Sequence, residues 1–348
     1  MPKPAAPLLA VGVIANPCSG RDMRRLLGWA SVFPSAEKVH VVLRLLAAMG
    51  SQGVTQAWML PDEAGIAERV RELADLARTR RGQAMPAVTL LDMRRVDSAA
   101  DSTLAARLMV QRGVGLIAVL GGDGTHRAVA AGCADVPLAT LSTGTNNAFP
   151  ESREATLVGL AGALVMSGRV PAGVGLRANK RLRLLGDGVD ELALVDVCLT
   201  RQLDIGARAV WRAEDLIELY ASFAEPTAIG LSAIAGLAHP VSRDDPFGVH
   251  LHFGAGRVLQ APVMPGTISP FGIAAMARLR PGQAVRLPAF RGTVALDGER
   301  EIEVDANSRL QLTLDWDGPR TLAVAAALGD AARRGLLFSD PGAMALPD

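Results

Sequence analysis

The sequence has few cysteines and no long uninterrupted apolar run. Its three cysteines are odd in number and far apart, which argues against a disulfide framework and a zinc site and favours a reducing compartment; they are Cys18, Cys133 and Cys198. Although 49% of the residues are hydrophobic, no apolar run reaches the roughly 18 residues that a membrane-spanning helix needs. We therefore expect a cytoplasmic protein.

The apolar beginning of the chain carries one lysine, at position 3, and shares these features with a signal peptide. Gly12 interrupts the apolar run, however, and the run continues into Asn16-Pro17 with no small-x-small cleavage pattern. The segment Leu8–Ala15 therefore predicts a buried first β-strand.

Neither sign of charge is in excess. The 36 basic and 35 acidic residues leave a net charge of +1, which gives no bulk field for attracting nucleic acid. Lysine is scarce, at positions 3, 38 and 180, so nearly all basic residues are arginines, most of which we attribute to composition bias. No amphipathic helix rich in lysine or arginine is evident, so we expect no stable membrane association.

The first 145 residues alternate between strand-like and helix-like segments, which predicts a parallel sheet covered by helices on both faces. The strand-like segments are Leu8–Ala15, Ala87–Leu91, Leu116–Leu120 and Pro137–Leu141, and the helix-like segments are Glu37–Met49, Asp62–Arg80, Asp101–Arg112 and His126–Cys133.

After about residue 170, closely spaced short strands separated by turn residues predict an antiparallel β-sandwich. A helix over Ala213–Ala224 is expected to interrupt it, and a last helix, Ala323–Leu337, is expected to pack back on the first domain. The predicted strands are Leu182–Leu185, Leu192–Thr200, Gly248–Phe253, Gly256–Gln260, Ala284–Leu287, Gly292–Leu296, Glu301–Val304 and Leu310–Leu314.

The strongest motif is the loop Gly121-Gly122-Asp123-Gly124-Thr125, which follows a buried strand and precedes a helix. Glycines let backbone amides approach a phosphate closely, and the following helix presents free N–H groups to the same anion. A carboxylate beside phosphate is unfavourable unless it accepts a proton from an attacking hydroxyl or holds a magnesium ion. The alternative is an Asp-Gly turn without a ligand, but a carboxyl edge of an open α/β sheet favours the functional interpretation.

Two further loops follow predicted strands and would lie on the same sheet edge. Ser142–Asn147 offers hydroxyls and amides suited to phosphate or ribose, although an ordinary helix N-cap cluster uses the same residue types. Asn16–Gly20 is the other loop, and its alternative is a structural turn.

Several other enzyme motifs are not found in the sequence. It contains neither a GxxxxGK[ST] loop nor a GxGxxG fingerprint, and it has no protein-kinase motif set and no GxSxG elbow. The five histidines form no metal-binding pattern. His250 and His252 share a strand face, which we interpret as ordinary polar alternation on a half-exposed strand.

Taken together, the motifs resemble the superfamily of NAD kinases, diacylglycerol kinases and sphingosine kinases, and are most similar to the acetoin-catabolism protein X group, which is NAD-kinase-like. The resemblance covers about residues 10–320. It rests on Asn16-Pro-x-Ser-Gly20, Gly121–Thr125 followed by His126, Thr143-Gly-Thr-Asn-Asn147, Ala193–Val197, Val263–Ile268 and Leu296-Asp-Gly-Glu299.

The resemblance implies a Rossmann-like α/β domain (1–148), a β-sandwich acceptor domain (149–320) and a C-terminal helix (321–348) that packs on the first domain. It implies phosphoryl transfer from ATP with Mg²⁺ to a hydroxyl, for NAD the 2′-hydroxyl of the adenosine ribose, and a homodimer as the default assembly. Asp123 matches the catalytic aspartate. Residues matching phosphate-binding positions are Asn16, Ser19, Gly20, Gly121, Gly122, Gly124, Thr125, Thr143, Gly144, Thr145, Asn146 and Asn147, and those matching acceptor-binding positions are Asp196, Gly266 and Thr267.

The sequence departs from the superfamily on the acceptor side. The asparagine expected in the Ala193–Val197 strand is Val195, and the loop rich in threonine and serine is reduced to Gly266-Thr267. Two alternatives to NAD kinase therefore stay open: a kinase for a lipid or another small hydroxyl metabolite, and a nucleotide-sensing protein without catalysis.

Overall fold

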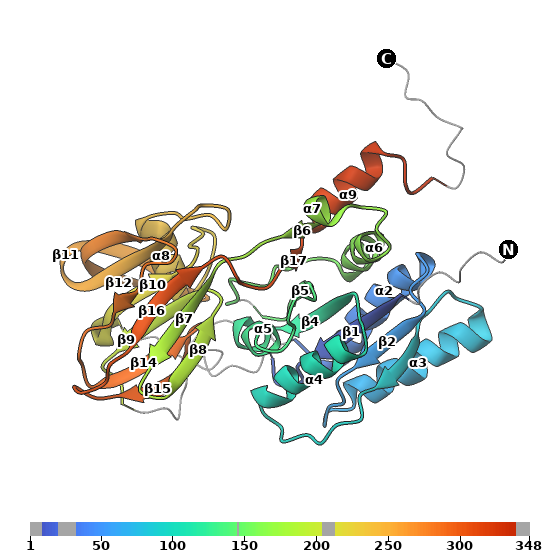
Figure 1. The fold of residues 1–348 in the computed structure, drawn as a ribbon, viewed down its shortest axis with the longest axis horizontal. Helices are drawn as coiled ribbons and strands as arrows, with labels where there is room; N and C mark the ends of the chain where they lie inside the picture. The colour runs from blue at the N-terminus through green and yellow to red at the C-terminus, as the bar shows by residue number, and fades with distance from the viewer. Residues whose placement is uncertain (1–8, 20–32, 145, 204–212, 339–348) are drawn as a thin grey trace, which may run out of the picture.

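In the computed structural model, which describes residues 9–19, 33–144, 146–203 and 213–338, the alternating first part of the chain forms a seven-stranded sheet, sheet A (Figure 1). The strand order is β3-β2-β1-β4-β5-β17-β6, parallel except for β6 at the edge. The strands are β1 (Ala10–Ala15), β2 (Gln56–Met59), β3 (Ala87–Leu90), β4 (Leu116–Gly121), β5 (Leu138–Ser142), β6 (Leu176–Arg177) and β17 (Thr321–Leu322).

Helices cover both faces of sheet A. Because side chains alternate along each strand, β4 sends Leu116, Ala118 and Leu120 into one apolar cluster and Ile117 and Val119 into another. Helices α2, α3, α6 and α9 contribute to the first cluster, and α4 and α5 to the second. The helices are α2 (Ser35–Ser51), α3 (Ile66–Arg81), α4 (Ala99–Gln111), α5 (Asp123–Ala130), α6 (Ala155–Met166), α7 (Ala172–Gly175) and α9 (Val324–Arg333).

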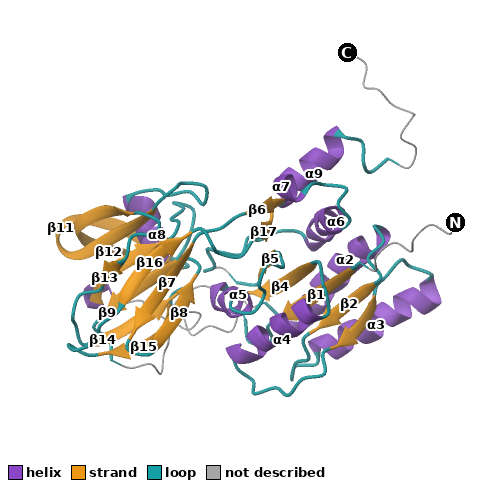
Figure 2. Ribbon diagram, in the orientation of Figure 1, coloured by secondary structure: helices purple, strands orange, loops and turns teal. Residues whose placement is uncertain are grey.

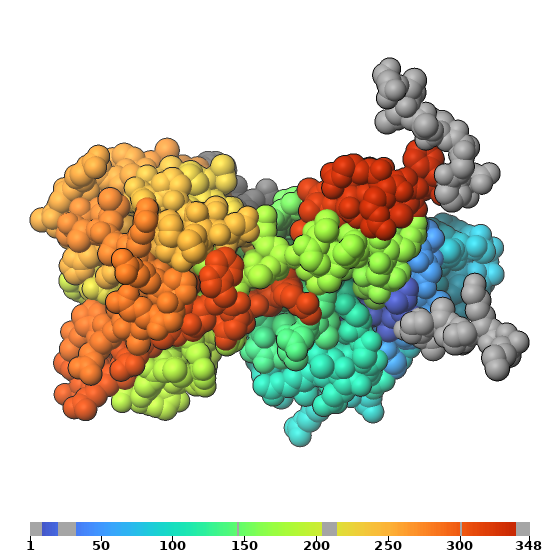
Figure 3. All heavy atoms as spheres, turned by 45° about the horizontal axis from the view of Figure 1, so that its top comes forward, coloured from blue at the N-terminus to red at the C-terminus, as the bar shows by residue number. Residues whose placement is uncertain are grey.

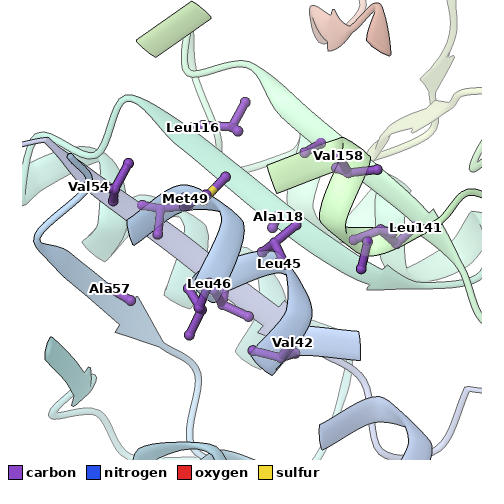
Figure 4. Packing of buried hydrophobic residues seen from close by; sticks show 14 of the residues in the cluster. Val42, Leu45, Leu46, Met49, Val54, Ala57, Leu116, Ala118, Leu141 and Val158 are labelled. Carbon is purple, nitrogen blue, oxygen red and sulfur yellow. The ribbon is translucent and has the colours of Figure 1, made fainter. Parts of the chain in front are cut away.

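The larger cluster fixes α2 on the sheet. Figure 4 shows Leu45, Leu46 and Met49 of α2 packed among residues of the sheet that include Leu116 and Leu141. The three α2 side chains are fully buried, and each such side chain contributes about 1.5–3 kcal/mol through burial. This packing holds in place the strands from which the candidate site is built.

The C-terminal part of the chain returns to sheet A. Strand β17 pairs with β5, and α9 packs on α6 and α7; Figure 3 shows α9, in red, against the green segment that precedes the sandwich. The chain passes from sheet A to the four-stranded sheet of the sandwich between Arg177 of β6 and Arg181 of β7. The division into domains after residues 148 and 320 stays a prediction.

The middle of the chain forms an antiparallel sandwich of two sheets (Figure 2). From β9, Val197 and Leu199 pack toward sheet B, while Cys198 joins the cluster beneath α8 (Leu231–Ala238). Sheet B contains β7 (Arg181–Gly186), β8 (Val189–Ala193), β13 (Val285–Arg286) and β16 (Gln311–Asp315); sheet C contains β9 (Asp196–Thr200), β10 (Leu216–Ala221), β11 (Gly248–Met264), β12 (Thr267–Leu279), β14 (Gly292–Leu296) and β15 (Glu299–Val304). The predicted fold class, an α/β domain followed by an all-β sandwich, is confirmed.

The helix predicted over Ala213–Ala224 is wrong. Only a short 3₁₀ turn, Ala213–Asp215, is helical, and β10 follows it. Helix propensity is a weak preference that tertiary context overrides. Here β10 pairs with β9 on one side and β11 on the other, so its backbone groups and both of its faces are used within sheet C.

Two strand boundaries also differ from the prediction. The single strand Leu192–Thr200 is divided into β8 and β9, because the N–H groups of Leu194 and Val195 bond to the Asp297 carboxylate. The two predicted strands between Gly248 and Gln260 join into β11, which continues through a register shift near Gly254.

None of the helices in the ranges given above is long and apolar enough to cross a membrane.

Candidate functional site

Three loops follow the adjacent parallel strands β1, β4 and β5 at one edge of sheet A. We call them the first loop (residues 16–19), the glycine loop (residues 121–125) and the third loop (residues 142–147). Of the predicted site residues, Gly20 and Thr145 lie outside the described residues. The structure brings the others of the phosphate-binding set to this one edge.

Side-chain hydrogen bonds join the first loop to the other two. The Asn16 Nδ2 donates to Thr125 Oγ1 at 2.8 Å, and Thr143 Oγ1 donates to Ser19 Oγ at 2.8 Å. Asn16 Oδ1 also accepts from the Cys18 amide at 2.9 Å, which shapes the loop as an Asx turn. The three loops therefore form one connected unit.

A side chain at either of two glycines of the glycine loop would meet neighbouring side chains. A Cβ on Gly121 would lie 2.5 Å from Thr125 Cβ, and a Cβ on Gly122 would lie 2.8 Å from Asn147 Oδ1. The helix α5 begins at Asp123, three residues earlier than predicted, so Asp123, Gly124 and Thr125 form its first turn. The N–H groups at this end of the helix have the orientation that favours an anion.

The third loop closes back on the glycine loop. The Thr143 amide donates to the Gly121 carbonyl at 3.4 Å. Ser142 Oγ accepts from Asn147 Nδ2 at 2.8 Å and donates to the Gly144 carbonyl at 2.9 Å. Asn146 is half-buried in the same segment.

The Asp123 carboxylate faces the backbone that follows the third loop. It accepts hydrogen bonds from the Ala148 amide at 3.0 and 3.2 Å and from the Phe149 amide at 2.8 Å. These bonds fix the orientation of the group that sequence predicts to be catalytic. Among the described residues, no group of three His, Cys, Asp or Glu side chains is arranged to hold a metal ion.

His126, in the second turn of α5, has a structural role. Its ring is fully buried, and Nδ1 lies 2.8 Å from the Gly122 carbonyl, to which it donates. Burial lowers the pKa of His126 to about 4, so the ring is neutral at pH 7. The imidazole therefore supports the glycine loop from behind.

Asp196, which sequence predicts to bind the acceptor, lies at the start of β9 and is 4% exposed. Its backbone is joined to Asp297: the Asp196 amide donates to Asp297 Oδ1 at 3.3 Å, and the Asp297 amide donates to the Asp196 carbonyl at 2.9 Å. Val195 is buried in an apolar cluster with Phe149, Leu194 and Phe223. The position expected to hold asparagine is thus filled by a side chain that packs against the segment after the third loop.

Gly266 lies in the turn between β11 and β12, and Thr267 is the first residue of β12. Pro265 and Gly266 are the two central residues of this turn. Gly266 has a φ of +79°, which is the conformation that the second central position of a type II turn requires. Within the described ranges, no hydrogen bond joins Gly266 or Thr267 to the three loops. The structure therefore does not bring this predicted acceptor segment into the hydrogen-bonded unit.

Asp297, in the turn between β14 and β15, belongs to the Leu296-Asp-Gly-Glu299 motif but is not among the predicted site residues, and it is a further functional candidate. Its carboxylate is fully buried and accepts from the amides of Leu194 and Val195 at 2.8–3.1 Å. Burial raises the pKa of Asp297 to about 7; Asp123 acts in the same direction, whereas Arg127 opposes it.

Three basic residues support the site without belonging to any predicted motif. Lys38 of α2 is fully buried and donates to the carbonyls of Asn16, Pro17 and Ser19 at 2.8–3.0 Å. Arg127 and Arg243 connect sheet A to the sandwich. The sequence held a clue to Lys38, because it is one of only three lysines and lies within an apolar helix. It also held a clue to Arg127, which follows Asp123 by four residues and so lies on the same helix face. The sequence held no clue to Arg243.

Comparisons with known proteins agree with this architecture. Residues 11–170 match the ATP-NAD kinase N-terminal domain family, and residues 180–317 match the acetoin catabolism protein X C-terminal domain family. The chain is 44% identical over 342 residues to acetoin catabolism protein X of Cupriavidus necator, with 95% of this chain and 94% of that protein covered.

Two solved structures from Bacillus anthracis strain Sterne, each provisionally described as a diacylglycerol kinase, are also similar. They have TM-scores of 0.46, are 11% and 14% identical, and match 90% of this chain and 98% and 96% of theirs.

Proposed function

The chain belongs to the acetoin catabolism protein X family, and on this basis we propose that it is a phosphotransferase that moves a phosphoryl group from ATP to a hydroxyl acceptor. The observation that carries the proposal is the joining of three loops at the carboxyl ends of β1, β4 and β5, where ligands bind in open α/β sheets. Membership of the family supports a kinase-type function.

The glycine loop is suited to the donor phosphates. Its glycines keep the backbone of β4 and the first turn of α5 free of side chains at the sheet edge, and the N–H groups at the start of α5 favour negative charge. The Lys38 ammonium adds a buried positive charge behind the first loop. We assign the donor phosphates to the space in front of these loops.

Asp123 is the proposed general base. The acceptor oxygen attacks the γ-phosphorus, the bond from that phosphorus to the bridging oxygen breaks, and ADP leaves. The acceptor hydroxyl gives its proton to the Asp123 carboxylate, whose orientation is set by the Ala148 and Phe149 amides. Catalysis in such transfers depends mostly on positioning and on neutralising charge.

Oxygen donors that suit magnesium lie beside the glycine loop. Mg²⁺ is usually held by one or two carboxylates together with substrate phosphates. The Glu299 carboxylate lies against Gly124, where a Cβ would be 3.5 Å from Oε2, and Gly124 follows Asp123 in the chain. Glu299 is therefore the carboxylate that would hold the ion while Asp123 acts as the base, and the ion would supply charge neutralisation at the phosphates.

For the acceptor, we propose the adenosine ribose 2′-hydroxyl of NAD first. The match of residues 11–170 to the ATP-NAD kinase N-terminal domain supports this choice. In this reaction the 2′-hydroxyl becomes a phosphate ester and NADP is the product.

A second acceptor class, a small hydroxyl metabolite of acetoin breakdown, is favoured by one observation. Val195 is 1% exposed and packs with Phe149 and Phe223, so the expected asparagine amide is replaced by an apolar contact. The 44% identical relative is named for acetoin catabolism, which supplies the metabolic setting of this alternative.

Phosphate transfer from labelled ATP tests the proposal directly. The purified protein, with ATP and Mg²⁺, is offered NAD, NADH, small diols or lipid vesicles, and the phosphorylated product is identified by mass spectrometry. A phosphorylated product from one acceptor, lost in Asp123→Asn, supports the proposal. Nucleotide binding by calorimetry with no transfer to any acceptor would contradict it and favour a nucleotide-sensing protein.

A further inference from the structure

Arg243 reaches from the sandwich to the backbone beside Asp123. It lies in the segment between α8 and β11, and its side chain is 6% exposed. Its Nη2 donates to the Ala148 carbonyl at 2.5 Å and to the Phe149 carbonyl at 2.9 Å. The guanidinium lies 4.2 Å from the Phe223 ring centroid and 5.3 Å from that of Phe149, which fixes its plane.

One peptide group lies between Arg243 and Asp123. The carbonyl of Ala148 accepts from Arg243, and the amide of the same peptide unit, that of Phe149, donates to Asp123 Oδ1 at 2.8 Å. A cation at one end and a carboxylate at the other polarise this chain of hydrogen bonds in the same direction. The Asp123 carboxylate is therefore tied through a single peptide plane to a charge on the opposite side of the interface.

The surroundings of Arg243 keep it in this position. Burial lowers the pKa of Arg243, and the nearby carboxylates of Glu225, Glu151 and Asp123 oppose that effect. Glu225 Oε1 lies 3.6 Å from the Arg243 Nε. A buried arginine that satisfies two carbonyls and stacks on two rings has few other orientations.

Arg127 provides a natural comparison, because it crosses the same interface in the opposite direction. It extends from α5 to an ion pair with Glu301 and lies 3.6 Å from Asp297 Oδ2. Its side chain is 11% exposed. Arg127 makes no described bond to Ala148 or Phe149, so its contribution to the interface does not pass through their peptide group.

We propose that Arg243 is a positioning residue for phosphoryl transfer, which orients the Asp123 carboxylate through the Ala148–Phe149 peptide group. This inference rests on the proposed function for its kinetic consequence, whereas the ordering of residues 148–149 is independent of any acceptor. The sandwich thereby takes part in the chemistry of the glycine loop without touching the donor phosphates.

Two measurements test the inference on the full-length protein. In Arg243→Met, hydrogen exchange of the Ala148 and Phe149 amides should accelerate at least about tenfold, because their segment loses its anchor. With the acceptor found in the transfer screen, kcat should fall about 10–100-fold while KM for ATP changes little, since the donor loops are intact. Arg243→Lys, which keeps a donor for the carbonyls, should recover part of both losses.

Arg127→Met is the matched control, since it removes the other arginine of the interface. It should lower stability without accelerating exchange at residues 148–149 to the same extent. Unchanged exchange of these amides in Arg243→Met would overturn the inference, as would a kcat loss no larger than that of Arg127→Met. If no acceptor is found, the proposed function fails, while the exchange experiment still decides whether Arg243 orders the segment bound by Asp123.

Discussion

The proposed phosphate side and the proposed acceptor side of this protein are built in different ways. On the phosphate side, the motif residues are neighbours in space: Asn16 bonds Thr125, and Thr143 bonds Ser19. Among the residues predicted to bind the acceptor, Asp196 is held at the start of β9, while Gly266 and Thr267 lie at the end of a separate hairpin. Short loops on adjacent parallel strands must meet at one edge, whereas loops of an antiparallel sandwich emerge at several places.

The interface between the two sides depends on charges outside the motifs. Arg127 extends into the turn that holds Asp297, and Arg243 extends back to the carbonyls of Ala148 and Phe149. The sequence motifs identify the residues of the three loops. Arg127 and Arg243, which join the two sides, are identified only from their contacts in the structure.

The largest effect is expected on the phosphate side. Asp123→Asn should reduce phosphoryl transfer about 10²–10⁴-fold, because the amide cannot accept the proton of the acceptor. Steady-state transfer from labelled ATP measures it. Asp190→Asn, which changes an exposed carboxylate paired with Arg183, is the control and should leave the rate unchanged. A loss of less than about tenfold would count against Asp123 as the base.

The next largest effect is expected on the stability of the proposed acceptor side. Asp297→Asn should lower the free energy of unfolding by about 1–3 kcal/mol, because one of the two oxygens that accept from the buried amides between β8 and β9 becomes an NH2 group that faces Arg127. Asparagine tolerates the φ of +51° at this turn, so the backbone is not strained. Urea unfolding gives the value; Asp317→Asn, in an exposed pair with Arg181, should change it by less than about 1 kcal/mol.

Restoring the expected asparagine is a more moderate change. Val195→Asn places an amide in an apolar cluster and should lower the free energy of unfolding by about 1–2 kcal/mol without improving transfer to NAD. Val195→Ala is the control for lost volume alone. A gain in NADP formation by Val195→Asn would show that this one residue decides the acceptor. The proposed acceptor side would then depend on a single motif residue, as the phosphate side depends on its motifs.

The smallest effect is in pH dependence. The folded pKa of Asp297, about 7, lies above the unfolded value of about 3.9, so the folded chain binds more protons between these values. The contribution of Asp297 to the free energy of unfolding therefore falls as pH rises, by about 1 kcal/mol between pH 6 and 8. Unfolding of wild type and Asp297→Asn across this range should show the slope only in the wild type; equal slopes would contradict the assignment.

Much of the phosphate side could be predicted because local sequence determines it. The order of strand, Gly121-Gly122 and helix is decided by residues close in the chain, although the helix starts at Asp123 rather than at the predicted His126, and a Cβ on Gly121 would meet Thr125 four residues later. The strand β10 could not be predicted, because residues 216–221 have helix-forming composition and become a strand only between β9 and β11.

The sequence by itself determined the α/β layer, the sandwich and the loops that meet at one sheet edge, since periodicity, glycines and turn residues act over short distances. Only the tertiary structure decided what surrounds Asp123. Arg243 and the Ala148 carbonyl that it bonds are 95 residues apart in the chain, and Arg127 and its partner Glu301 are 174 residues apart. The positions of charged side chains buried at an interface depend on three-dimensional packing, and no local pattern in the chain encodes these positions.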